Sequence, residues 1–172
     1  MNDTPSFDAD AFRRFEHDGW TEVAARYNDS FGVLTGQSVE AVLDAADVGP
    51  DKGMLDLACG TGKHAVAAVA RGARVNGLDL SEAMVAQAKA SCPGADIDVG
   101  DAQDLPYEEK SFDAVVCGFG LLHFPDAHAA VAEVARILRP GGRFVCSCWR
   151  PAEQSPYLAI LRDAMAEFGS MD

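Results

Sequence analysis

The chain has 172 residues, of which 48% are hydrophobic and 24% are charged, a composition typical of one globular domain. Its 14 basic and 27 acidic side chains give a formal net charge of −13, which argues against nucleic acid and anionic lipid surfaces as partners. No apolar run approaches the roughly eighteen residues of a membrane span, and residues 1–5 lack the features of a signal peptide. We therefore expect a cytoplasmic protein without a membrane span.

The five cysteines do not form the pattern of a disulfide-rich or zinc-binding protein. Their number is odd, no Cys-x-x-Cys pair occurs, and most of them lie in apolar segments that resemble strands. Cys146 and Cys148 would place both thiols on one face of a strand, which is weak support for a metal site. We therefore predict reduced cysteines and no bound metal.

The first 50 residues are predicted to form a helical cap. Apolar and aromatic residues recur at near-helical spacing between Phe7 and Asn28, and Gly19 is expected to divide this stretch into two short helices. A further helix is predicted around residues 39–46, ended by the Gly49-Pro50 turn. The regular part of the chain begins after this turn.

From residue 51 to residue 172 the chain alternates strands and helices with short connections. The predicted strands cover residues 54–58, 74–78, 97–99, 112–117 and 143–149, and the predicted helices cover residues 63–71, 81–90, 127–138 and 156–168. This alternation is typical of parallel strands joined by right-handed crossovers, so we expect a doubly wound α/β sheet in one compact unit with the cap. Ligands of such sheets bind beyond the carboxyl ends of the strands.

The octet from Leu55 to Gly62, Leu-Asp-Leu-Ala-Cys-Gly-Thr-Gly, combines an apolar strand with a two-glycine turn. Gly60 and Gly62 let the backbone approach a ligand, and the helix that follows offers free N–H groups. Asp56 would repel a phosphate and attract an ammonium or sulfonium group. The stretch from Gly60 to Ala65 also satisfies the G-x-G-x-x-G/A dinucleotide pattern, so it leaves an NAD-dependent oxidoreductase open.

Two further aspartates predict a nucleoside site. Asp79 ends the second predicted strand, where its carboxylate could accept both ribose hydroxyls, or could merely precede the helix cap Ser81. Asp101 could accept from an exocyclic amine while the Ala102 N–H donates to a ring nitrogen, an arrangement that suits adenine. The alternative for Asp101 is a hydrogen bond to the backbone of its own loop.

Five motifs, in order, are similar to those of the class I methyltransferases that use S-adenosylmethionine. They are Leu-Asp-Leu-Ala-Cys-Gly-Thr-Gly at 55–62, Gly-Leu-Asp-Leu-Ser at 77–81, Gly-Asp-Ala-Gln-Asp-Leu-Pro-Tyr at 100–107, Phe-Asp-Ala-Val-Val at 112–116 and Leu-Arg-Pro-Gly-Gly at 138–142. The last is expected to be a sharp architectural turn. The chain resembles especially the small-molecule subgroup that includes the ubiquinone and menaquinone biosynthesis enzymes.

This resemblance implies a Rossmann-like sheet, mostly parallel, of order 3-2-1-4-5 that lacks the last two strands of the family. It implies S-adenosylmethionine as cofactor and in-line transfer of its methyl group to a small-molecule acceptor. Residues 51–172 would then be the cofactor-binding domain, and residues 1–50 its helical cap.

The resemblance also implies the cofactor contacts. Asp56 and the turn glycines would hold the methionine end, Asp79 the ribose hydroxyls, and Asp101 with Ala102 the adenine. Leu80 would pack on the adenine face, the backbone near Cys117 and Gly118 would meet the methionine ammonium, and Tyr27 would close over the cofactor. With the strand end at residue 58, the expected set is Asp56, Ala58, Gly60, Gly62, Asp79, Leu80, Asp101, Ala102, Cys117, Gly118 and Tyr27.

No catalytic residue is predicted, because a sulfonium methyl is already activated and the protein mainly supplies alignment. His64 is expected to be a surface or packing residue. Two roles stay open for His123, which could hold its loop or contact the acceptor. The acceptor pocket is expected to be lined by segment 119–124 and by the aromatic residues Phe12, Phe15 and Trp20, which favours an apolar or planar acceptor.

Only residues 150–172 follow the last predicted strand, which would therefore lie at an unfinished sheet edge. Either the chain is shortened, or a partner, with a second copy as one form, completes the edge. This keeps a non-catalytic cofactor-binding or interaction module open as an alternative to a methyltransferase, with an NAD-dependent oxidoreductase as a third reading.

Overall fold

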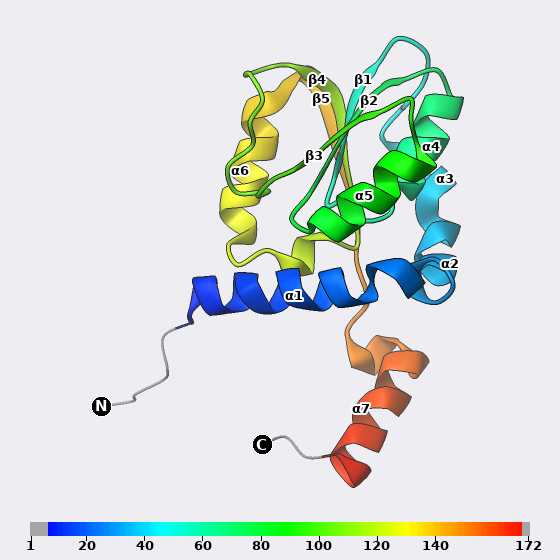
Figure 1. Cartoon of the computed structure of the whole chain (residues 1–172), viewed down its shortest axis with the longest axis vertical. Helices are drawn as coiled ribbons and strands as arrows, with labels where there is room; N and C mark the ends of the chain where they lie inside the picture. Colours follow the sequence, from blue (N-terminus) through cyan, green and yellow to red (C-terminus); the bar gives the residue numbers. More distant parts are fainter. Residues whose placement is uncertain (1–6, 170–172) are drawn as a thin grey trace.

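The computed structural model describes residues 7–169 and shows a five-stranded sheet (Figure 1). All neighbouring strands pair in parallel in the order β3-β2-β1-β4-β5, which confirms the predicted sheet. The strands are β1 (Gly53–Leu57), β2 (Arg74–Asp79), β3 (Asp96–Val99), β4 (Phe112–Gly118) and β5 (Leu138–Ser147). Residues 1–5, which entered the prediction of a cytoplasmic protein, lie outside the described range.

Seven α-helices accompany these strands in the described part of the chain. They are α1 (Ala9–Tyr27), α2 (Phe31–Thr35), α3 (Val39–Ala45), α4 (Lys63–Ala70), α5 (Glu82–Ser91), α6 (Ala127–Ile137) and α7 (Pro156–Phe168). Three short 3₁₀-helices are η1 (Gly36–Ser38), η2 (Leu121–His123) and η3 (Ala152–Gln154). None of the described helices combines the length and the apolar composition that crossing a bilayer requires.

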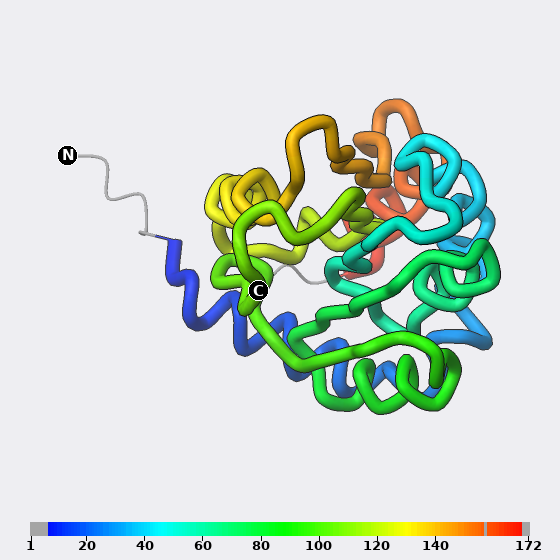
Figure 2. Tube along the Cα trace, turned by 90° about the horizontal axis from the view of Figure 1, so that it is seen from above, coloured from blue at the N-terminus to red at the C-terminus, as the bar shows by residue number. Residues whose placement is uncertain are grey.

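The alternation of side chains along the strands divides the core into two layers. On β1, Met54 belongs to the cluster that contains residues of α3, α4 and α5, whereas Leu55 and Leu57 belong to the cluster that contains residues of α6. The sheet accordingly lies between α3, α4 and α5 on one face and α6 on the other (Figures 1 and 2). Both faces are apolar because both are covered, as is usual for parallel sheets.

Helix α1 is continuous through Gly19, so the predicted break at this glycine is wrong. Asp8 caps the first turn by accepting the Ala11 N–H at 2.9 Å, and Arg26 in the last turn complements the helix dipole. The helix also runs along the end of the sheet and contacts α5 (Figure 1). These interactions outweigh the roughly 0.5–1 kcal/mol that an interior glycine costs.

The stretch Pro140-Gly141-Gly142 lies within β5, so the expected sharp turn ahead of the last strand is instead an irregularity inside a longer strand. β5 begins at Leu138, and its pairing with β4 shifts register between Phe112 and Ala114. Gly141 has a φ of 82°, a left-handed conformation that glycine adopts without strain. The motif therefore shapes an edge strand.

β5 forms one edge of the sheet, and no strand in the described range pairs with its outer side. Cys146 and Cys148 on this strand and just beyond it are exposed free thiols, whereas the other three cysteines are buried free thiols. Helix α7 packs against η3 and extends away from the sheet (Figure 1).

We expect Gly19→Ala to raise the free energy of unfolding by about 0.5–1 kcal/mol, because alanine is favoured over glycine inside a helix. A Cβ at this position meets nothing within 4 Å. Gly72→Ala is the matched control: its φ of 83° makes alanine strained, so stability should fall by about 1–2 kcal/mol. Urea denaturation measures both, and a loss of stability in Gly19→Ala would contradict a continuous α1.

Candidate functional site

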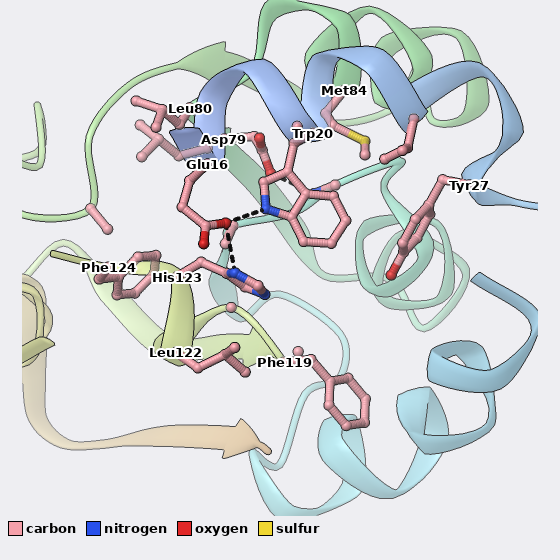
Figure 3. Close-up of a pocket in the computed structure, with 18 of the residues that line it drawn as sticks. Glu16, Trp20, Tyr27, Asp79, Leu80, Met84, Phe119, Leu122, His123 and Phe124 are labelled. Carbon is pink, nitrogen blue, oxygen red and sulfur yellow. Dashed lines mark hydrogen bonds and ion pairs between the residues drawn. The ribbon is translucent and has the colours of Figure 1, made fainter. Parts of the chain in front are cut away.

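A cavity of about 520 Å³ lies beyond the carboxyl ends of β1, β2 and β4, between the sheet and α1 (Figure 3). Ala58, Asp79 and Gly118 line it from the three strand ends, and Trp20 lines it from α1. Its wall is mostly apolar, with a few charged groups from α1, β2 and the loop after β3. Its volume falls in the range of small-molecule sites.

Two carboxylates fix the turn between β1 and α4. Asp56 accepts the Ala65 N–H at 3.0 Å and so connects β1 to the first turn of α4. Asp79, at the end of β2, accepts the Gly60 N–H at 2.8 Å with one oxygen and the Ser81 N–H at 3.0 Å with the other. Gly60 has a φ of 53°, and a Cβ there would meet nothing within 4 Å, so its backbone is open towards the cavity.

The cavity brings together most of the residues expected from the sequence. Those that line it are Tyr27, Ala58, Gly60, Asp79, Leu80, Asp101, Ala102 and Gly118. The other three lie behind the lining: Asp56 and Cys117 are fully buried, and a Cβ on Gly62 would lie 3.2 Å from the Ala88 Cβ. Gly62 allows α4 to pack on α5, and Asp56 holds the turn from inside.

Asp56 and His64 form a buried pair under this turn. His64 Nδ1 lies 3.9 Å from Asp56 Oδ1, and neither that carboxylate oxygen nor His64 Nε2 has a hydrogen-bond partner among the described residues. Burial raises the pKa of Asp56 well above its usual value and lowers the pKa of His64 to about 4. The His64 ring also fills the space beside Gly118, where a Cβ would lie 2.2 Å from His64 Cε1. His64 is thus a packing residue, as expected, in the interior.

Asp101 combines the two roles considered for it. Its carboxylate accepts the Gln103 N–H at 2.9 Å, which is the expected loop bond, and it also lines the cavity. Its second oxygen accepts from Arg13 Nε of α1 at 3.0 Å. Asp101 therefore shapes the loop, holds α1 and still faces the site.

Helix α1 is attached to the sheet domain by polar contacts that the sequence did not indicate. Besides the Arg13–Asp101 pair, His17 lies 2.9 Å from Glu82, and the Thr21 and Ser81 hydroxyls are 3.0 Å apart. Hydrogen bonds to Asp18 and Glu82 raise the pKa of His17. Because Ala24 is the one buried residue in this helix, these contacts and the cavity-facing side chains hold it in place.

The aromatic lining differs in part from the expectation. Trp20 lines the cavity, but Phe15 is 72% exposed and the Phe12 ring packs on Phe7 with a centroid separation of 5.5 Å. Phe12 and Phe15 therefore do not form the pocket, because a continuous α1 turns them away from it. The aromatic residues that do line it are Trp20, Tyr27, Phe31, Phe119, Phe124 and Trp149.

Glu16 and His123 face each other across the cavity wall (Figure 3). Glu16 Oε2 accepts the Trp20 indole N–H at 3.0 Å and lies 2.7 Å from His123 Nδ1. The imidazole packs against the Trp20 ring edge to face, with 4.9 Å between centroids. Glu16 was not predicted from the sequence, because it looks like one of many acidic residues on an exposed helix.

We expect His64→Gln to remove a pH dependence of stability. Below pH 6.5 the unfolded chain takes up a proton at this histidine that the folded chain, with a pKa of about 4, does not bind. His64 therefore lowers stability as the pH falls from about 6.5 to about 4, by a total of about 3 kcal/mol. Urea denaturation across this range should show a flatter profile for His64→Gln than for the native chain and for the exposed control His128→Gln. Parallel profiles would contradict the neutral buried state.

Comparisons with known proteins find similarity to methyltransferases. A family model described as a methyltransferase domain matches residues 55–146. The chain is 44% identical over 108 residues to the demethylmenaquinone methyltransferase of Staphylococcus aureus (strain MRSA252), covering 58% of this chain and 45% of that protein. It is 37% identical over 143 residues to the enzyme of the same name from Beutenbergia cavernae. This match covers 81% of this chain and 60% of that protein.

Among solved structures, the chain is similar to one in the complex between the Haloferax volcanii Trm112 methyltransferase activator and a methyltransferase. The TM-score is 0.68 and the sequence identity is 30%, and the match covers 78% of this chain and 59% of that chain. The chain spans about half the length of the curated relatives it matches. Because the family model covers more than half of its residues, this chain belongs to the family of S-adenosylmethionine-dependent methyltransferases.

Proposed function

We propose that the cavity under α1 binds S-adenosylmethionine and that the chain catalyses transfer of the methyl group to a small-molecule acceptor. The observation that carries this proposal is Asp79, a carboxylate in the cavity wall that also anchors the Gly60 backbone. Each carboxylate oxygen can accept more than one hydrogen bond. Both oxygens of Asp79 thus keep capacity for the two ribose hydroxyls.

The other proposed contacts with the cofactor are based on where the remaining lining residues lie in the cavity. Asp101 and Ala102 would hold the adenine ring, with Leu80 against its face, and the backbone at Ala58, Gly60 and Gly118 would receive the methionine end. Tyr27, whose hydroxyl lies 3.1 Å from that of Thr35, would cover the cofactor from α1. A smaller pocket of about 40 Å³ beside Gly60, lined by polar residues that include Thr61 and Lys63, extends this end of the site.

The charges in the wall favour a sulfonium cofactor over a dinucleotide. Glu16, Asp79 and Asp101 bring three carboxyl groups to the lining, against the single guanidinium of Arg13, which is already paired with Asp101. A pyrophosphate would meet repulsion there, whereas a cation would be attracted. This balance argues against the NAD-dependent oxidoreductase that the glycine pattern alone leaves open.

When bound, the cofactor supplies a methyl group on a positively charged sulfur, which leaves as a neutral thioether after in-line attack. The chain then has to hold the acceptor in line and keep water out. Within the predicted cap of residues 1–50, the described helix α1 serves this purpose, because it covers the site that the strand ends build.

The acceptor that the cavity favours is apolar and planar. Trp20, Phe119, Phe124 and Trp149 give the lining flat apolar surfaces, and the Phe119 and Trp149 rings stack at 4.4 Å. The relatives from Staphylococcus aureus and Beutenbergia cavernae are named for a quinone-type acceptor, which agrees with this wall. We propose an aromatic or quinone-like acceptor.

The open side of β5 suits pairing with a second copy of the chain, and we retain this homo-oligomer as part of the proposal. A module that binds the cofactor without transferring its methyl group is the alternative. A panel of aromatic acceptors separates the two, because only a methyltransferase converts the cofactor to S-adenosylhomocysteine in the presence of an acceptor.

We expect calorimetry to show binding of S-adenosylmethionine and no binding of NAD. Asp79→Asn should weaken the former about 10- to 100-fold, because an amide has one acceptor oxygen in place of two and loses the charge-assisted bonds. Asp96→Asn, at an exposed position of β3, is the matched control and should bind as the native chain does. Binding of NAD alone, or equal affinities for both variants, would contradict the proposal.

A further inference from the structure

Lys63, the first residue of α4, carries a positive charge that the proposed cofactor contacts do not use. Its stem packs on two glycines of the segment formed by α2 and η1. A Cβ on Gly32 would lie 3.1 Å from Lys63 Cε, and a Cβ on Gly36 would lie 3.4 Å from Lys63 Cδ. The two glycines therefore leave a groove that holds the methylene groups of the lysine, as apolar surfaces often do for such stems.

The ammonium group of this lysine has no partner in the described part of the chain. Lys52 and Lys89 pair with Asp47 and Asp98, whereas the Lys63 ammonium forms neither an ion pair nor a hydrogen bond within residues 7–169. The chain has 27 acidic side chains against 14 basic ones, and Lys63 is only half-exposed. A partly buried cation is costly unless it is paired, so this group is available to an anion from outside the chain.

A pocket of about 40 Å³ is lined by Lys63 and adjoins the main cavity. Tyr27, Ala58, Gly60 and Gly118 line both of them. The main cavity has carboxyl groups in its wall, whereas no carboxyl group of the described residues lines the smaller pocket. A ligand that extends from one into the other would match these charges if it were positive along its length and negative at its tip.

The hydroxyl groups that line the smaller pocket have already used their protons. Thr61 donates to Asn28 Oδ1 at 2.8 Å, and Thr35 donates to the Phe31 carbonyl at 3.2 Å. The Tyr27 hydroxyl lies 3.1 Å from Thr35 Oγ1, and it is the donor of that bond because the threonine has a single proton. The side-chain donors left for an anion are therefore those of the lysine ammonium, which has three.

The buried carboxyl group beneath the turn does not oppose an anion in this pocket. Asp56 is fully buried and does not line the pocket, which is lined instead by His64, whose Nδ1 lies 3.9 Å from Asp56 Oδ1. Burial raises the pKa of Asp56 well above its usual value, which favours the neutral carboxyl group. The charge that an anion meets here is therefore that of Lys63.

We propose that the smaller pocket receives the carboxylate at the methionine end of the cofactor and that Lys63 is its counter-ion. This inference rests on the proposed function, in which the main cavity holds the rest of S-adenosylmethionine. A pocket of about 40 Å³ has room for a group of a few atoms. Lys63 is then a specificity-determining residue that favours cofactors with a free carboxylate over decarboxylated ones.

The probes for this inference are two stable ligands that differ in one group. S-adenosyl-3-thiopropylamine keeps the adenosine, the thioether and the amine of S-adenosylhomocysteine and lacks only the carboxylate. Calorimetry on the native chain should show that loss of the carboxylate weakens binding about 10- to 100-fold, which is the usual effect of a hydrogen bond between charged groups. A native chain that binds both ligands with equal affinity would overturn the carboxylate site.

Lys63→Met removes the charge and keeps a stem that can pack on the two glycines. It should weaken binding of S-adenosylhomocysteine about 10- to 100-fold and leave binding of the amine within about twofold of the native value. Lys63→Arg should restore part of the preference, because it restores the charge. Lys89→Met, at an exposed position of α5, is the matched control and should keep the native preference.

The two ligands distinguish a counter-ion from a residue that only supports the turn. Equal losses for both ligands in Lys63→Met, as a loosened or unfolded turn would produce, would overturn the role of Lys63, and so would unchanged binding of both. A native chain that binds neither ligand would instead overturn the proposed function, and the inference with it.

Discussion

The site depends on the way two carboxylates hold the turn after β1. Asp56 fixes the first turn of α4 from below, and Asp79 fixes the Gly60 N–H from the end of β2. Loss of either acceptor would leave a backbone N–H without a partner, at a cost of about 1–3 kcal/mol where the group is buried. These bonds set the backbone that shapes the floor of the cavity, so the position of every proposed cofactor contact on this floor follows from them.

The roof of the site is held by a different kind of interaction. Helix α1 buries only Ala24 and is attached through polar pairs to the loop after β3, to α5 and to η2. Such exposed and partly exposed polar bonds contribute little to stability, because water and salt compete for the same groups. With few buried apolar contacts, α1 is the part of the site with the least packing, which suits an element that must admit a cofactor and an acceptor.

The alternation of apolar strands and helices predicted the parallel sheet, because apolar runs, glycines and aspartates leave local signals. The order of the strands came only from the resemblance to class I methyltransferases. The predictions from sequence were wrong where contacts between distant parts of the chain determine the structure. Gly19 looks like a break until α1 is seen against α5, and Phe15 looks like a pocket residue until the helix is continuous. The bond from the Ala65 N–H to Asp56 was not predicted, because a lone acidic residue in a strand gives no sign of its backbone partner. Glu16 gave no signal, since its partners lie far away in sequence or on the inner face of α1.

The most direct test of this account is a crystal structure of the chain with S-adenosylhomocysteine. The account predicts ligand density between the sheet and α1, with the ribose hydroxyls at Asp79, the adenine beside Leu80 and Asp101, and Asp56 shielded from the ligand. Density outside this cavity, or a direct bond from Asp56 to the ligand, would contradict it.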